Sequence, residues 1–257
     1  MSGLRLRALV LALLAPLVLA QAEPRLVPDV SDRNIEIRYS FSGAQLLLFG
    51  AILYPGGRTP DEAADIAVVL KGPLEPIVVR EKQKVAGIWV NVERVRFRSA
   101  PAYYAVASSR PIGELVDERT AAIYELGLEN LQLSPGGGAS PEVMRRFEQG
   151  LIDLRRRQQV YVEYPGGVAI SEGVLYRARI AIPARVPVGT YTAETFLIRD
   201  GRIIAGAARE INIEKLGFER FVADAAERSS LAYGIVAVAL SLLLGWGASA
   251  LFNRRYA

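Results

Sequence analysis

Two spacings of apolar residues alternate along this chain and divide it into a β-rich part, a helical part and a second β-rich part. From residue 33 to about 106, apolar residues recur at every second position or form short runs punctuated by glycine and proline. In the segment NIEIRYS, for example, Ile35, Ile37 and Tyr39 alternate with charged residues. A period of two is typical of strands that bury one face. We therefore predict several short strands here, as in a β-sandwich.

Between about residues 112 and 158 the spacing becomes that of a helix. Segments 118–133 and 140–158 are separated by the glycine-rich SPGGGAS, and Ser140 followed by Pro141 is a typical start of a helix. One apolar stripe of the second helix consists of Val143, Phe147, Leu151 and Leu154. Arginines 155–157 end this helix, where cations suit its dipole. An anionic-lipid or phosphate patch is an alternative reading of these three arginines.

Strand-like patterning resumes after residue 158. Asp200-Gly201 lies between two β-rich runs and predicts a tight hairpin, so that 191–213 forms the last two strands. Gly189 followed by Tyr191 resembles the tyrosine corner of immunoglobulin-like folds. We expect one Ig-like β-sandwich, completed by strands on both sides of a helical insertion at about 112–158.

The N-terminal 22 residues have the three parts of a secretory signal peptide. Arg5 and Arg7 give a positive start, an apolar run interrupted only by Pro16 follows, and Ala20-Gln21-Ala22 offers a small-residue cleavage site. The sequence therefore predicts export, with the mature chain beginning near Glu23.

The C-terminal segment 231–252 has no charged residue and is long enough to span a bilayer. Tyr233 and Trp246 are expected to anchor it at the membrane interface, and Arg254 and Arg255 place the tail 253–257 in the cytoplasm. We expect an exported β-sandwich domain at 23–216, a juxtamembrane stalk at 217–230 and one transmembrane helix at 231–252. The lipid bilayer is then a direct partner.

The net positive charge does not indicate nucleic-acid binding. Of the 31 lysines and arginines, Arg5, Arg7, Arg254 and Arg255 lie in the targeting and tail segments, which leaves 27 cations against 27 anions. A domain with equal numbers of positive and negative side chains has no excess positive charge to attract nucleic acid. We expect no nucleic-acid partner.

Missing residue types restrict the chemistry. The chain has no cysteine and no histidine, which excludes thiol nucleophiles, Ser-His-Asp triads and nearly all zinc catalysis. Acidic clusters occur at Asp61-Glu62-Asp65 and Glu114-Asp117-Glu118, and either could hold Ca²⁺, but neither has the spacing of a dedicated calcium loop. We predict no catalytic, metal or cofactor site.

One stretch offers a candidate binding surface. FRSAPAYYAVASSRPI places Tyr103 and Tyr104 close to Arg110 at the junction of the β-rich and helical parts. Such a group could stack on a ligand or bind an anion. The alternative is a strand whose tyrosines pack inside the fold.

Six sequence blocks carry a resemblance to a known family: DIAVVLKGP, VVREKQKVAGIWVN, APAYYAVASSRPI, IPARVPVGTYTAETFLIRDGR, EKLGFERF and AYGIVAVALSLLLGWGASALF. They occur in one order across nearly the whole mature chain and resemble the alphaproteobacterial transmembrane protein family, whose members have no established activity. The resemblance implies an inner-membrane protein with its domain in the periplasm. It also implies an accessory role beside a sulfite-exporter-like permease, and it supplies no catalytic residues.

These observations favour a non-catalytic interaction module that is held in the periplasm by one helix and assists a membrane partner, such as a small-anion exporter. Two alternatives stay open. One is a carboxylate-dependent enzyme that acts on envelope glycans. The other is a ligand-binding sensor that uses the surface formed by Tyr103, Tyr104 and Arg110.

Overall fold

The computed structural model describes residues 23–37, 43–60, 63–215, 222 and 226–253. These residues fall into two compact units. One contains the strands and helices up to Ile213, apart from a short segment around Ile37, and the other contains the C-terminal helix. The segment 1–22, expected to be a signal peptide, lies outside the described residues.

The first unit contains a four-stranded antiparallel sheet. Its strand order is β1-β3-β11-β10, with bounds β1 Arg25–Val30, β3 Gly43–Leu53, β11 Leu175–Pro183 and β10 Val168–Ser171. The central pairing joins distant parts of the sequence, since Gly43 is aligned with Pro183 and Ala51 with Leu175. Strands from both β-rich parts therefore complete one sheet.

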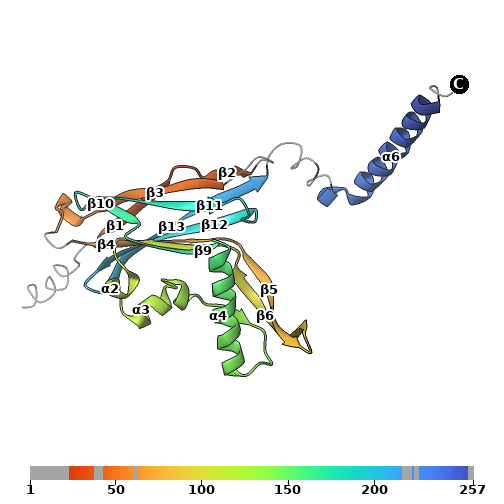
Figure 1. Cartoon of the computed structure of the whole chain (residues 1–257). Helices are drawn as coiled ribbons and strands as arrows, with labels where there is room; N and C mark the ends of the chain where they lie inside the picture. Colours follow the sequence, from red (N-terminus) through yellow and green to blue (C-terminus); the bar gives the residue numbers. More distant parts are fainter. Residues whose placement is uncertain (1–22, 38–42, 61–62, 216–221, 223–225, 254–257) are drawn as a thin grey trace, which may run out of the picture. The chain divides into compact units, whose positions relative to one another are not determined.

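A six-stranded sheet packs against the first (Figure 1). Its order is β2-β13-β12-β4-β7-β9, with bounds β2 Asn34–Ile37, β13 Arg202–Lys215, β12 Gly189–Arg199, β4 Asp65–Lys71, β7 Tyr104–Ser108 and β9 Tyr161–Pro165. The expected Asp200-Gly201 turn between β12 and β13 is confirmed, because φ is +50° at Asp200 and +74° at Gly201. The pairing of β7 with β9 is parallel.

The main core lies between these two sheets. Leu46 and Ile52 of β3 and Ile180 of β11 are buried on one side, and Ile66 and Leu70 of β4 are buried in the facing sheet. Strand β4 is buried at its five central positions, as expected for a strand covered on both faces. The prediction of a mainly β, sandwich-like domain with a C-terminal apolar helix is confirmed.

The α-helices of the first unit lie between residues 112 and 157, on the side of the six-stranded sheet away from the four-stranded one (Figure 1). They are α2 Ile112–Leu115, α3 Glu118–Ile123 and α4 Pro141–Arg157. The prediction of one helix over 118–133 is wrong. Helix α3 ends at Ile123 because φ is positive at Glu125 and Gly127, and a 3₁₀ turn, Leu128–Asn130, follows.

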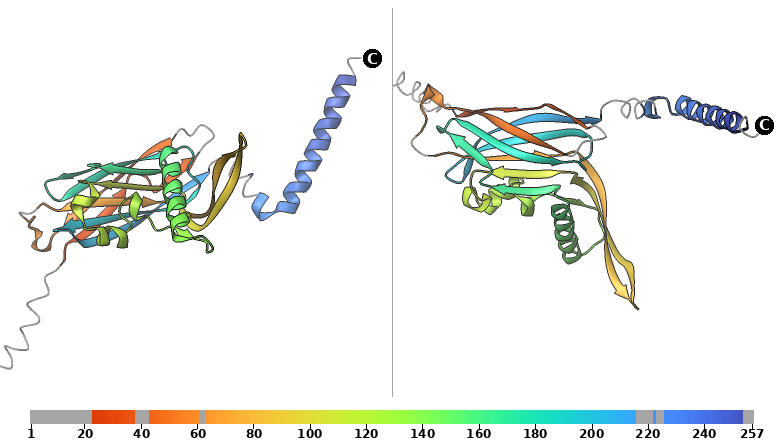
Figure 2. Two further views of the ribbon diagram at one scale, coloured as in Figure 1. Left: turned by 60° about the horizontal axis from the view of Figure 1, so that its bottom comes forward. Right: turned by 45° about the horizontal axis from the view of Figure 1, so that its top comes forward.

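A third sheet was not expected as a separate element. Strands β5 Leu74–Val85 and β6 Ile88–Pro101 form a long hairpin, to which β8 Ser134–Pro135 adds a short third strand. The hairpin leaves the sandwich beside α4, and its distal part extends beyond both sheets (Figure 2). Ala86 and Gly87 form a two-residue turn with φ of +49° and +87°, the signs required by a type I′ turn.

The second unit contains α6, Ser230–Asn253. In the described part of the chain, one helix is long and apolar enough to cross a membrane, and its apolar segment is Ser230–Gly247. Its 24 residues correspond to about 36 Å of helix. The stalk expected at 217–230 lies largely outside the described residues.

Candidate functional site: the β5–β6 hairpin

The ligand surface expected from Tyr103, Tyr104 and Arg110 does not exist, because both tyrosines are fully buried. The Tyr103 hydroxyl donates a hydrogen bond of 2.8 Å to the carbonyl oxygen of Ala181 on the facing sheet. The Tyr104 hydroxyl donates to the carbonyl oxygen of Glu125 at 2.6 Å and accepts from the Gly127 N–H at 3.0 Å. These side chains tie elements of the fold together.

Burial raises the pKa of both phenols far above the ordinary value, so neither acts as an acid or base near neutral pH. The Tyr103 ring also contacts the Tyr191 ring, with centroids 6.0 Å apart. The alternative weighed for this stretch, a strand whose tyrosines pack inside the fold, is what the structure shows.

Arg110 lies on the surface and is already paired. Its guanidinium donates to Asp65 at 2.5 Å and lies 3.7 Å from Glu114. Burial acts to raise the pKa of Asp65, but hydrogen bonds from Arg110 and Ser109 outweigh it and lower the pKa below its ordinary value. Arg110 is therefore engaged in an ion pair that joins β4 to the segment before α2.

The acidic clusters are not assembled into a metal site within the described residues, where no three acidic side chains group suitably for a metal ion. Asp117 instead caps α3 by accepting from the Thr120 N–H at 2.8 Å, and Glu114 pairs with Arg110. Asp61 and Glu62 lie outside the described residues.

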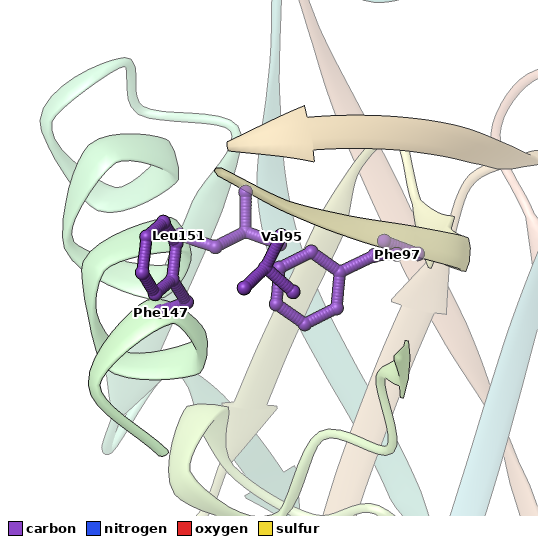
Figure 3. Close-up of a cluster of buried hydrophobic side chains, with 5 residues drawn as sticks. Val95, Phe97, Phe147 and Leu151 are labelled. Atoms are coloured by element: carbon purple, nitrogen blue, oxygen red, sulfur yellow. The ribbon is translucent and has the colours of Figure 1, made fainter. Parts of the chain in front are cut away.

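Helix α4 braces the proximal half of the hairpin through a small apolar core (Figure 3). Phe147 and Leu151 of α4 are buried against Val95, Phe97 and Ala100 of β6. The helix begins as expected, since the Ser140 hydroxyl accepts from the Val143 N–H and Pro141 occupies the first turn. The predicted stripe is partly wrong, because Leu154 is 48% exposed.

Ion pairs reinforce the same face. Arg146 contacts both Glu81 of β5, at 3.0 Å, and Glu93 of β6. Nearer the sandwich, Arg155 donates to Glu75 at 2.5 Å. Because Arg155 has this partner, the alternative reading of arginines 155–157 as one free anion patch is not supported. The acidic groups of the hairpin on its α4 side are thus neutralised by α4.

On the opposite face of the hairpin, every charged side chain is a cation. Side chains alternate between the two faces of a strand, and the register places Arg80 opposite Arg94 and Val78 opposite Arg96, away from α4. We call the six exposed cations of this side the basic face: Arg80, Lys82, Lys84, Arg94, Arg96 and Arg98. None of the six forms an ion pair within the described part of the chain. The hairpin is therefore electrostatically two-sided.

A hollow of about 600 Å³ opens beside the basic face. It is lined by Arg80, Arg94 and Arg96 and by the glycine loop 136–138, with apolar walls from Val78, Val95 and Ala139. Glycines leave backbone groups accessible because they have no side chain, and guanidinium groups are strong donors to oxyanions. The chemistry of this hollow suits an anionic group.

The end of the hairpin is apolar and exposed. We call five side chains around the turn the apolar tip: Val85, Ile88, Trp89, Val90 and Val92. Trp89 is 66% exposed and Ile88 is 69% exposed. A bulge near Val92 shifts the register between the Glu81–Glu93 and Lys82–Asn91 pairs. Clustered exposed apolar side chains of this kind indicate an interaction site.

One comparison with known proteins, the family match, bears on the membrane character of the chain. The family described as "Putative transmembrane protein (Alph_Pro_TM)" matches residues 25–254, which is nearly the whole chain. The chain belongs to this family. Because the match includes α6, this apolar helix fits a single-pass membrane protein.

No curated protein matches the sequence. A solved structure of Spo0M, the sporulation control protein from Bacillus subtilis, is similar with a TM-score of 0.29 and 11% identity. The match covers 80% of this chain and 56% of Spo0M, so the chain spans just over half the length of that protein.

The membrane segment that the family description requires carries both aromatic anchors expected from the sequence. Tyr233 lies near the start of α6 and Trp246 lies in its second half, and both are exposed. Their anchoring role stays a prediction. Arg254 and Arg255 lie outside the described residues.

Sequence reasoning missed the hairpin as a separate element, although a signal was present. Segments on both sides of Ala86-Gly87 were expected to be strands, but the pair was not recognised as a tight turn. The stretch from Arg80 to Arg98 also contains cations at alternating positions around an exposed tryptophan. The pattern alone does not place these cations on a common face of the hairpin, because that requires the strand register.

Proposed function

We propose that this chain is a non-catalytic interaction module, anchored in the bacterial inner membrane by α6 with its β-sandwich domain in the periplasm. The single observation that carries this proposal is the hairpin itself. It combines a helix-braced base, one neutralised face, one basic face and an exposed apolar tip. Such an arm buries little of itself within its own domain, so its exposed surface is available to a partner.

The base of the arm is rigid enough to present that surface. Phe147 and Leu151 fix β6 to α4, and the ion pair between Arg155 and Glu75 fixes β5 to the same helix. A binding element held by a packed core loses less conformational freedom on association than a flexible loop. The arm therefore fits a docking role better than a role as a linker.

The partner we propose is a component of the membrane that holds the chain. The resemblance to the alphaproteobacterial family suggests an accessory role beside an inner-membrane exporter of small anions, of the sulfite type. A domain tethered to a membrane meets membrane partners at high effective concentration, so modest contacts suffice for association.

Site-specific photo-crosslinking in cells tests this function. A photoreactive residue at Val92 of the apolar tip should capture the same membrane component reproducibly. The matched control carries the residue at Arg179, an exposed position of β11 on the sandwich, and should capture nothing specific. Equal capture from both positions, or no capture from either, would contradict the proposal.

A further inference from the structure

The apolar tip and the distal basic face form one continuous surface. Lys84 is the cross-strand partner of Trp89, and Lys82 is the partner of Asn91 two residues farther from the turn. Between Lys82 and Val92 the sequence contains two lysines and no acidic residue. An exposed tryptophan and its neighbouring cations therefore approach a partner together.

The basic face has unfavourable electrostatics in isolation. Arg80 and Arg94 are directly opposite each other, and like charges in that relation destabilise a strand pair. The acidic residues Glu81 and Glu93 cannot relieve this repulsion, because their partner is Arg146 on the other side of the hairpin. An external anionic surface would supply the missing counter-charge.

The apolar tip decides which anionic surface fits. A dissolved phosphate ion would pair with the arginines but would leave Trp89 and Ile88 in water. Tryptophan prefers the interface of a bilayer, where its ring meets apolar chains and its N–H meets polar groups. Lysines extend their charged ends toward lipid headgroups from the same depth. An exposed tryptophan beside lysines therefore fits a lipid surface better than a dissolved anion.

Such a surface is within reach of the chain. Fourteen residues separate Lys215 at the end of β13 from Ser230 at the start of α6. Fully extended, they span at most about 50 Å. This length keeps the domain close to the bilayer in which α6 is anchored. The bilayer is thus present at high effective concentration.

We infer that the β5–β6 hairpin docks on the anionic bilayer that anchors the chain, with the apolar tip inserted among the headgroups and the basic face bound to lipid phosphates. This inference rests on the proposed function and adds a second contact for the same hairpin, the lipid of the anchoring membrane. It makes the domain a two-point membrane binder, held by α6 and by the hairpin.

Tryptophan fluorescence of the full-length chain tests the docking. The chain has two tryptophans, so the variant Trp246→Phe leaves Trp89 as the single probe. The chain is reconstituted in nanodiscs of phosphatidylcholine alone or mixed equally with phosphatidylglycerol. In the anionic discs, Trp89 emission should shift to shorter wavelength, be protected from acrylamide and be quenched by lipids brominated on their acyl chains.

The basic face is tested by Lys82→Ser with Lys84→Ser. Each lysine removed should lower the ratio of docked to undocked hairpin about five-fold in anionic discs, the factor that corresponds to the usual attraction of one lysine to an anionic surface. The matched control is Arg177→Ser with Arg179→Ser, two exposed cations of β11, which should leave the ratio unchanged. Equal melting temperatures of the three chains verify their folding.

Two results would overturn the inference. In the first, acrylamide still quenches Trp89 in anionic discs, or the Trp89 emission changes by the same amount in neutral discs and in the variant without the two lysines. In the second, Trp89 is shielded from acrylamide but not quenched by brominated lipid, which identifies a second copy of the chain as the occupant. If either result is obtained but the hairpin still crosslinks to a membrane protein in cells, the proposed interaction module is supported and lipid docking is rejected.

Discussion

The Tyr191 hydroxyl donates a hydrogen bond of 2.8 Å to the carbonyl oxygen of Pro187, four residues earlier in the chain. This is the geometry of the tyrosine corner that Gly189 and Tyr191 suggested in the sequence. The bond fixes the entry of the chain into β12, and the ring of Tyr191 is fully buried beside Tyr103. A local sequence pattern thus defines a corner of the sandwich.

Tyr191→Phe should lower the free energy of unfolding by about 1–2 kcal/mol, because it leaves the Pro187 carbonyl oxygen without its donor. Urea unfolding of the full-length chain in mild detergent measures the change. Tyr124→Phe is the control, since Tyr124 is 38% exposed and packs by its ring against Phe196. A loss of equal size in both variants would show that the hydrogen bond is not the cause.

Two leucines of α4 provide a matched test of the hairpin brace. Leu151→Ala should cost about 2–5 kcal/mol, because Leu151 is fully buried against β6. Leu154→Ala, one turn away and 48% exposed, should cost well under half of that amount. Hydrogen exchange should increase at β5 and β6 amides in the first variant only. Unchanged exchange there would mean that α4 does not brace the hairpin.

Two glycines should respond to alanine in opposite directions. In Gly72→Ala the new Cβ would lie 2.9 Å from the Tyr191 ring and 3.1 Å from the Tyr103 backbone nitrogen, so overpacking should cost about 1–3 kcal/mol. In Gly150→Ala the Cβ meets nothing within 4 Å, and alanine in a helix interior should stabilise by about 0.5–1 kcal/mol. Melting temperatures that move in the same direction would contradict this assignment.

The ion pair of Asp65 should make part of the stability depend on pH. The pKa of Asp65 in the folded chain is below the ordinary value of 3.8, so its contribution is present above that value and is lost as the pH falls through the folded pKa. The stability difference between the wild-type chain and Asp65→Asn should therefore shrink below about pH 4. Denaturant unfolding at neutral and acidic pH measures it.

The control for this titration is Asp153→Asn, an exposed aspartate of α4 without an ion pair among the described residues. At neutral pH its stability should differ little from that of the wild-type chain, because the side chain is exposed. If the Asp65→Asn difference is constant from neutral to acidic pH, the ion pair with Arg110 does not stabilise the fold.

The repulsion on the basic face can be reversed by one substitution. Arg94→Glu places an acidic residue opposite Arg80 and should stabilise the chain by about 0.2–1 kcal/mol, more at low salt than at high salt. Destabilisation by Arg94→Glu at low salt would show that Arg80 and Arg94 do not repel each other.

The sequence allowed the elements with a local signal to be predicted. The turn at Asp200-Gly201, the start of α4 at Ser140 and the apolar run of α6 each depend on a few adjacent residues, and all three are present. The end of α3 was missed because positive φ at Glu125 has no distinct residue signature. Glutamate is an uncommon residue in that conformation.

The candidate site could not be predicted, for a physical reason. Tyr103 and Arg110 are seven positions apart, yet one lies in the core and the other in a surface ion pair, and only strand pairing decides which. In the same way, Arg80 and Arg94 become neighbours only when the hairpin register aligns them. The electrostatic character of a sheet face is a property of the pairing and not of either strand alone.

The pairing of β3 with β11 also has a kinetic consequence. Gly43 and Pro183 are more than half the chain apart, so the centre of the four-stranded sheet cannot form until most of the domain has been synthesised. Closing such a long loop precedes any stabilising contact, and folds dominated by distant pairings are slow to form. In contrast, the β5–β6 hairpin has a two-residue turn and local pairing, so it can form early, before the β-sandwich has folded.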